Sequence, residues 1–165
     1  MKKILIALLL FLLCACKQGD VINNSAREKY NDMVDFLREH DTFTADSELF
    51  DISYDVSRIE GGYRFYIIID NVRTAMYDVT AIAIEPGVDY SSTMAASIGI
   101  FEENDYSLIP NQYNAQKGFV KGISISGLSD TERPELLLMV EWKNKDMSVT
   151  YREFIRLNAS GGNDE

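Results

Sequence analysis

Residues 63–70 have the sequence YRFYIIID, and this stretch does most to decide the fold class of the chain. Its β-branched and aromatic residues favour a β-strand. The stretch is apolar on both faces around residues 67–69, which is typical of a strand that has neighbours on either side. We therefore expect residues 63–70 to form a central strand of a sheet.

Alternating apolar and polar residues extend outward from this stretch. Phe50, Ile52, Tyr54 and Val56 alternate with polar residues, which predicts a strand with one face in solvent. Further strands are predicted at residues 77–85, 97–101, 119–126, 136–143 and 147–157. Because no helical pattern separates these segments, the sequence predicts a mainly β domain over residues 49–157, an antiparallel β-sandwich of about seven strands.

An amphipathic helix is predicted ahead of the strands, over residues 25–40. Ser25 and Glu28 form a capping-box pattern at its start. One apolar stripe then follows with the spacing i, i+3, i+4, i+7: Tyr30, Met33, Val34 and Leu37. A single helix cannot bury such a stripe by itself. The stripe is therefore expected either to pack on the β domain or to bind a partner or a second copy.

The first 15 residues have the features of a secretory signal peptide. Lys2 and Lys3 are followed by an apolar run over residues 4–13. A membrane-spanning helix needs about 20 apolar residues, so this run is too short for a stable span. We expect residues 1–15 to be removed during export.

The sequence Leu13-Cys14-Ala15-Cys16 resembles the lipobox of bacterial lipoproteins. The resemblance implies cleavage before Cys16 and a diacylglyceryl group on its thiol, with Cys14 lost in the signal peptide. The chain would then be lipid-anchored at the extracytoplasmic face of the cell membrane, with residues 16–24 as lipidated cysteine and polar tether. The alternative is an ordinary signal peptide with an incidental cysteine.

A second resemblance concerns the β domain. Residues 66–71, 117–127 and 135–143 are similar to strands of the Ig-like domains of uncharacterised Gram-positive lipoproteins, of the kind called immunoprotection or superinfection-immunity domains. This resemblance implies an Ig-like sandwich at the cell surface and brings no catalytic motif with it. The Cys-Trp-Cys pattern of antibody domains is absent, so no disulfide core is expected.

Composition excludes several classes of function. With 26 acidic and 16 basic residues, the chain has a formal charge of −10 and is a poor partner for nucleic acid. His40, the one histidine, lies at the expected C-terminal end of the helix, where a histidine side chain interacts favourably with the helix dipole. No hydrolase, zinc or nucleotide-binding motif is present, so we expect neither an enzyme nor a cofactor. The acidic, glycine-containing residues 158–165 are expected to be a disordered tail.

Three tyrosines in predicted loops are the candidate recognition residues: Tyr90, Tyr106 and Tyr113. A tyrosine ring offers a large contact area at a low entropy cost. We expect a binding or structural module of the cell envelope with a protein partner. The alternative is a sugar- or calcium-binding lipoprotein that uses these tyrosines together with acids such as those in residues 102–105.

Overall fold

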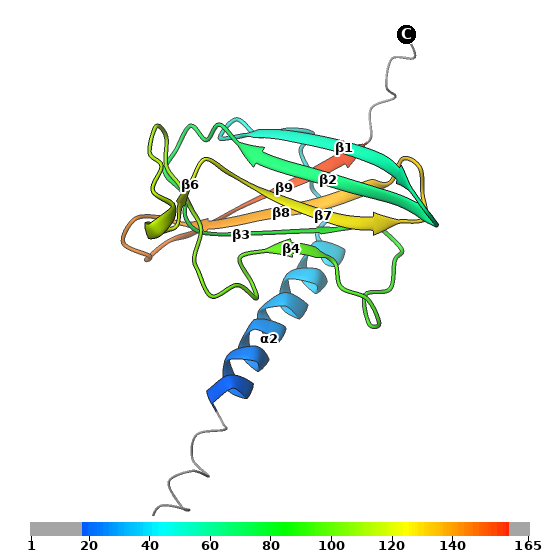
Figure 1. Cartoon of the computed structure of the whole chain (residues 1–165), viewed down its shortest axis with the longest axis horizontal. Coiled ribbons are helices and arrows are strands. Elements are labelled where there is room, and N and C mark those ends of the chain that lie inside the picture. The colour runs from blue at the N-terminus through cyan, green and yellow to red at the C-terminus, as the bar shows by residue number, and fades with distance from the viewer. Residues whose placement is uncertain (1–17, 159–165) are drawn as a thin grey trace, which may run out of the picture.

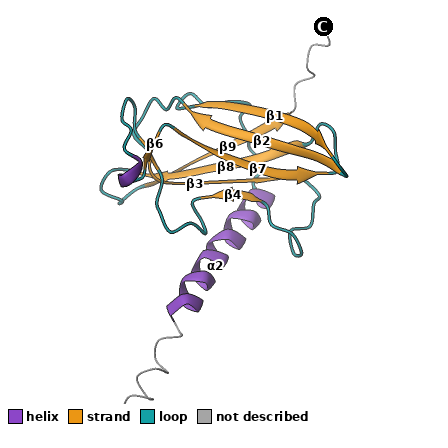
Figure 2. Cartoon of the chain, in the orientation of Figure 1, coloured by secondary structure: helices purple, strands orange, loops and turns teal. Residues whose placement is uncertain are grey.

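A computed structural model describes the backbone of residues 18–158 and the side chains of residues 24–158. The expected signal peptide, Cys16 and residues 159–165 lie outside this range. Figure 2 shows a long N-terminal helix followed mainly by strands, which confirms the prediction of a mainly β protein. The elements are α2 (Gln18–Glu39), β1 (Asp51–Ile59), β2 (Gly62–Asp70), β3 (Tyr77–Ile84), β4 (Ala96–Ile98), β5 (Ser107–Leu108), a 3-10 turn η1 (Ala115–Lys117), β6 (Phe119–Val120), β7 (Gly122–Ser129), β8 (Glu135–Lys143) and β9 (Thr150–Asn158).

The strands form two larger antiparallel sheets and one short parallel pair (Figure 1). One sheet has the order β1-β2-β7, and the other has the order β4-β3-β8-β9. Strand β2 covers residues 62–70 and lies between β1 and β7, so the prediction of a central strand is confirmed.

The two larger sheets share one hydrophobic core. Phe65, Ile67 and Ile69 of β2 lie in the same buried cluster as Leu138 and Trp142 of β8. Along β2 these residues alternate with exposed ones, and along β8 they alternate with residues on the other face of the four-stranded sheet, as the period of two requires. The cluster joins the sheets into one body.

Helix α2 covers the opposite face of the four-stranded sheet. All four residues of the predicted apolar stripe are buried there: Tyr30, Met33, Val34 and Leu37. They form a second hydrophobic cluster with Ile82 and Ile84 of β3 and Leu137 and Met139 of β8. The Tyr30 hydroxyl also accepts a hydrogen bond from the backbone N–H of Ala95 at 2.6 Å. The stripe therefore packs on the chain's own β domain.

The helix begins earlier than the sequence indicated. Residues 18–24, expected as part of the polar tether, are helical, and Ser25 lies inside α2 and not at its start. No proline interrupts this segment, so backbone hydrogen bonding can continue upstream of the capping-box pattern. In Figure 1 the Gln18 end of α2 lies farthest from the sheets.

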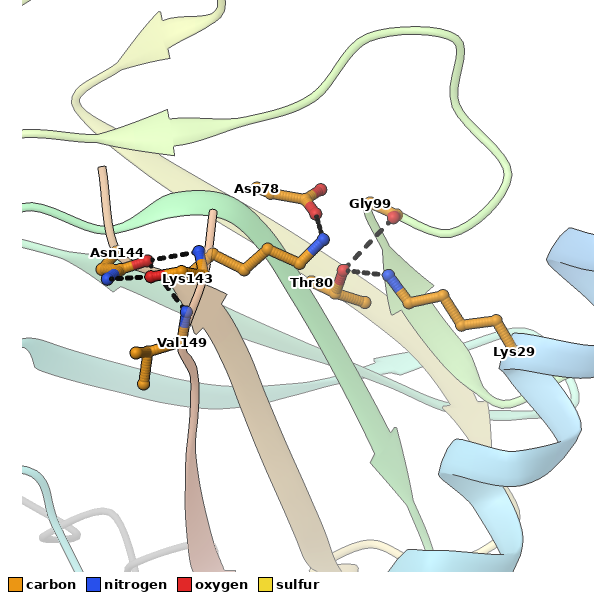
Figure 3. Close-up of polar contacts among 8 residues, drawn as sticks. Lys29, Asp78, Thr80, Gly99, Lys143, Asn144 and Val149 are labelled. Carbon is orange, nitrogen blue, oxygen red and sulfur yellow. Dashed lines mark hydrogen bonds and ion pairs between the residues drawn. The ribbon is translucent and has the colours of Figure 1, made fainter. Parts of the chain in front are cut away.

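Polar contacts fix the helix and the strand ends around β3 (Figure 3). Lys29 of α2 donates a hydrogen bond to the buried hydroxyl of Thr80 at 2.9 Å. Asp78 has a positive φ of 49° at a register shift in β3, and its carboxylate pairs with Lys143 at 2.6 Å. The hydrogen bond from Lys143 to Asp78 raises the pKa of this lysine, and Glu141 and Asp105 add to the effect.

Four details of the strands differ from the sequence-based expectation. The strand expected at residues 97–101 ends at Ile98, ahead of Gly99, which has a positive φ of 78°. Strand β5 was not predicted, because Ser107 and Leu108 are only two residues in a polar segment. The segment expected at residues 119–126 is divided into β6 and β7, and β6 pairs with β5 in parallel. Residues 147–149 lie in a turn and not in β9, since the side chain of Asn144 accepts hydrogen bonds from the N–H groups of residues 148 and 149.

Candidate functional site

The lipid attachment predicted at Cys16 lies outside the described residues. Cys16 precedes the first residue of α2 by two positions in the sequence. Among the helices of residues 18–158, none has the length and apolar character needed to cross a membrane. The anchoring of the chain therefore stays a prediction from the lipobox.

Tyr90 packs against the helix. Its hydroxyl accepts a hydrogen bond from the backbone N–H of Glu85 at 2.8 Å, and the guanidinium of Arg38 lies 5.8 Å from its ring centre. Burial raises the pKa of the Tyr90 hydroxyl. These contacts join the β3–β4 connection to α2, which is a structural role for this side chain.

Tyr106 and Tyr113 lie on the connection from β4 to β6, which Figure 1 places at the other end of the body from the β3–β4 connection. Tyr106 packs on the shared core, and its carbonyl accepts a hydrogen bond from Val79. Tyr113 is 63% exposed. Each of the three predicted tyrosines borders a different cavity, so the structure does not bring them together.

Tyr113 borders a shallow cavity of about 390 Å³, which we call the loop cavity. Its walls come from the two residues that follow β2, from the segment after β5 and from Lys121. They comprise Asn71, Val72, Ile109, Pro110, Asn111, Gln112, Tyr113 and Lys121. The sequence predicts Tyr113 as a recognition residue but does not single out the amides or the lysine. The Pro110-Asn111 pair, a common turn signal, could have indicated that this segment folds back.

Asn71 of the loop cavity is held by an acidic residue of β1. Its side-chain N–H donates to the Asp51 carboxylate at 2.7 Å, and Arg73 pairs with the same carboxylate. The bond from Asn71, followed by the bond from Arg73, holds the pKa of Asp51 below its ordinary value. The contacts place the carboxamide of Asn71 at the cavity wall.

This carboxylate gives an expected pH dependence. Because its pKa is lower in the folded chain than in the unfolded one, Asp51 contributes stability above its ordinary pKa, and the contribution is lost as the pH falls through the lowered value. The side-chain amide signals of Asn71 should therefore shift in an NMR titration over the acid range. In Asp51→Asn this shift should vanish, and an unchanged titration in that variant would contradict the assignment.

A second exposed feature is the outward side of the three-stranded sheet, which we call the outer sheet face. It carries one row of side chains from each strand, all exposed: Ser53, Asp55, Ser57, Arg64, Tyr66, Ile68, Ser124, Ser126 and Leu128. Tyr66 and Ile68 are 40% and 43% exposed, and Leu128 is 67% exposed. The strand at residues 63–70 is central, as predicted, but its apolar outward side is open.

Pairing across the strands makes the centre of the outer sheet face prominent. Ile68 lies between Ser53 of β1 and Ser124 of β7, and Tyr66 lies between Asp55 and Ser126. Serine is too small to cover its larger neighbours, so Tyr66 and Ile68 stand above the rows on either side. Asp55 and Arg64 carry the charges within these rows, and the rows continue on the same side of the sheet to the facing pair Asp51 and Asp70, so acidic groups outnumber basic ones there.

The acidic residues 102–105, considered for calcium binding, do not form a cluster of ligands. One oxygen of Glu102 accepts hydrogen bonds from three successive backbone N–H groups, those of residues 99–101, at 2.8 to 3.1 Å. Within the described part of the chain, no three His, Cys, Asp or Glu residues lie close enough together to hold a metal ion. The carboxylate of Glu102 thus stabilises its own loop.

His40 follows the last residue of α2, as the sequence indicated. Its backbone N–H donates to the Phe36 carbonyl at 3.0 Å, and its ring stacks on Phe154 of β9 with ring centres 3.8 Å apart. The side chain therefore joins the end of the helix to the sheet edge.

The geometry defines a mainly β protein with one packed N-terminal helix, a loop cavity and an open sheet face. Comparison of the chain with protein-family models, with curated proteins and with solved structures found no match in any of the three.

Proposed function

We propose that the chain is a bacterial lipoprotein, held at the extracytoplasmic face of the cell membrane by acyl groups on Cys16. In this proposal its β domain is an Ig-like sandwich and works as a protein-binding or structural module of the cell envelope, not as an enzyme. The observation that carries the binding role is the exposed outer sheet face with the large side chains of Tyr66, Ile68 and Leu128. The shared core between two antiparallel sheets supports the sandwich assignment.

The position of the helix supports a particular orientation of the β domain relative to the membrane. Helix α2 has 22 residues, which corresponds to a length of about 33 Å at about 1.5 Å per residue. It packs on the four-stranded sheet, and the outer sheet face lies beyond both sheets on the opposite side of the body. A lipid at Cys16 would therefore hold the helix side toward the membrane and turn the outer sheet face away from it.

The shape and chemistry of the outer sheet face favour a protein partner. Small ligands bind in concave sites, whereas this face is one side of an open sheet. Aromatic residues are enriched at the centres of protein interfaces, and Tyr66 lies at the centre of this face beside the apolar side chain of Ile68. Serine rows on either side supply hydroxyl groups for hydrogen bonds at the rim.

Site-specific photo-crosslinking on intact cells tests this proposal. A photoreactive residue at Ser124, in the outer sheet face, should give one discrete covalent product with an envelope protein. The matched control is the same residue at Asp32, which is exposed on α2. The product at Ser124 should fall at least tenfold when Tyr66→Ala and Leu128→Ala are combined, while circular dichroism stays unchanged. Equal products from both positions, or no discrete product at Ser124, would reject the proposal.

A further inference from the structure

The loop cavity has walls that are held in place before any ligand arrives. Asn111 has a positive φ of 60°, and the N–H of Gln112 donates to the carbonyl of Ile109 at 3.1 Å. Proline followed by a residue of positive φ, closed by this hydrogen bond, is typical of a type II turn. Leu108, directly before the turn, is fully buried and exchanges two backbone hydrogen bonds with Met76. The turn is thus attached to the core.

The far side of the segment is equally constrained. Asn114 and Phe119 exchange backbone hydrogen bonds at 2.9 and 3.0 Å across η1. Gly118 has a positive φ of 72°, and a Cβ atom there would lie 2.4 Å from the carbonyl oxygen of Asp105. Only glycine fits this close approach without strain. A ligand therefore meets a wall of fixed shape and loses little affinity to loop ordering.

The polar groups of the cavity are suited to hydroxyl groups. Asn71, Asn111 and Gln112 bring three carboxamides, and although one N–H of Asn71 is donated to Asp51, its amide keeps a second N–H and its oxygen. A sugar hydroxyl can likewise donate and accept hydrogen bonds, so a side-chain amide can accept a hydrogen bond from it or donate one to it. The exposed ring of Tyr113 offers a flat apolar surface for the C–H face of a pyranose ring. Amides around an exposed ring are therefore a combination that recognises carbohydrate.

The charge of the cavity adds a preference among sugars. None of the described residues that line it is acidic, although acids outnumber bases by 26 to 16 in the chain. Its one charged group is Lys121, whose ammonium lies 5.8 Å from the ring centre of Tyr113. The ammonium lies over the face of the ring, so a sugar that stacks there would displace it, and the flexible Lys121 side chain would then lie at the edge of the sugar. A carboxylate on the sugar would be attracted there.

We propose that the loop cavity binds a carboxylate-bearing sugar, with Tyr113 as the stacking platform, the three carboxamides as hydroxyl partners and Lys121 as the partner of the carboxylate. The proposal concerns a second site, separate from the residues of the outer sheet face, and it does not depend on the lipid. It differs from the sequence-based alternative, which paired the loop tyrosines with acids and calcium.

Binding of matched saccharides to the full chain in mild detergent tests the proposal. The probes are a galacturonic acid tetrasaccharide, the same tetrasaccharide with its carboxyl groups reduced to alcohols, and acetate. We expect saturation-transfer NMR to detect both saccharides, with the acidic one binding about tenfold more tightly at low salt. In a separate protein-observed titration, backbone amide shifts should be confined to residues 71–72, 109, 111–113 and 121. Acetate alone should bind at least tenfold more weakly than the acidic saccharide.

Variants separate the role of each group. Lys121→Gln should remove the preference for the acidic saccharide and leave binding of the neutral one unchanged, while Lys145→Gln, a lysine of the β8–β9 turn outside the cavity, should change neither. Tyr113→Ala should weaken both saccharides at least tenfold, and Tyr113→Phe should keep both. The proposal is overturned if neither saccharide binds at concentrations of several millimolar, if acetate binds as well as the acidic saccharide, or if Tyr113→Ala binds normally.

Discussion

Replacing Cys16 by serine is expected to abolish acylation of the chain and to move it from the membrane fraction to the soluble fraction. The lipobox resemblance assigns the acyl acceptor to the thiol of Cys16, and a serine hydroxyl would not take its place. Buried acyl chains contribute about 0.8 kcal/mol per methylene, so two or more chains hold a protein where surface contacts do not. A net charge of −10 also gives little attraction to an anionic membrane surface. The effect of the substitution should therefore be nearly complete.

Cys14→Ser is the matched control for this experiment. Cys14 is the other cysteine of the chain and would leave with the signal peptide, so this variant should keep the lipid. The measurements are incorporation of labelled fatty acid, the mass of the mature N-terminus and fractionation after a high-salt wash. If Cys16→Ser still carries label, or still sediments with membranes after the wash, the anchor assignment is wrong. Loss of label in Cys14→Ser would move the acceptor to that position.

The main strands could be predicted because their patterns are local. Along β2, every second residue packs in the shared core and the residues between them face solvent. This period of two is visible in the sequence. The same holds for the apolar stripe of α2, whose period of 3.6 identified the four residues that pack on the sheet. Such patterns report which side of an element is buried, without information on what covers it.

Features that depend on contacts between distant segments could not be predicted. The solvent exposure of Ile68 depends on which sheet the helix covers. This could not be predicted, because the sequence of residues 63–70 is apolar on both faces. The loop cavity combines Asn71 with Lys121, which are 50 positions apart in the sequence numbering. Strand β5 has only two residues and owes its position to Met76 and Phe119. Tertiary contacts, not local preference, set these features.

Leu37→Ala is expected to destabilise the whole domain by about 2–5 kcal/mol, the usual cost of removing a buried leucine side chain. Leu37 is 0% exposed and lies in the cluster between α2 and the four-stranded sheet. The matched control is the same substitution at Leu128, which is 67% exposed in the outer sheet face. Because its side chain is mostly in solvent, Leu128→Ala should change the free energy of unfolding by no more than about 0.5 kcal/mol.

Urea unfolding of the full chain, followed by the fluorescence of Trp142, measures both changes. Trp142 is the one tryptophan of the chain and is buried in the core between the sheets, in a different cluster from Leu37. A lower urea midpoint for Leu37→Ala at this distant probe would show that the helix and the sheets unfold together. If the Trp142 transition is unchanged while helical circular dichroism is lost early, the helix is a separately unfolding element. The orientation proposed for the outer sheet face would then fail, because a helix that detaches at low cost cannot fix which side of the domain points away from the membrane.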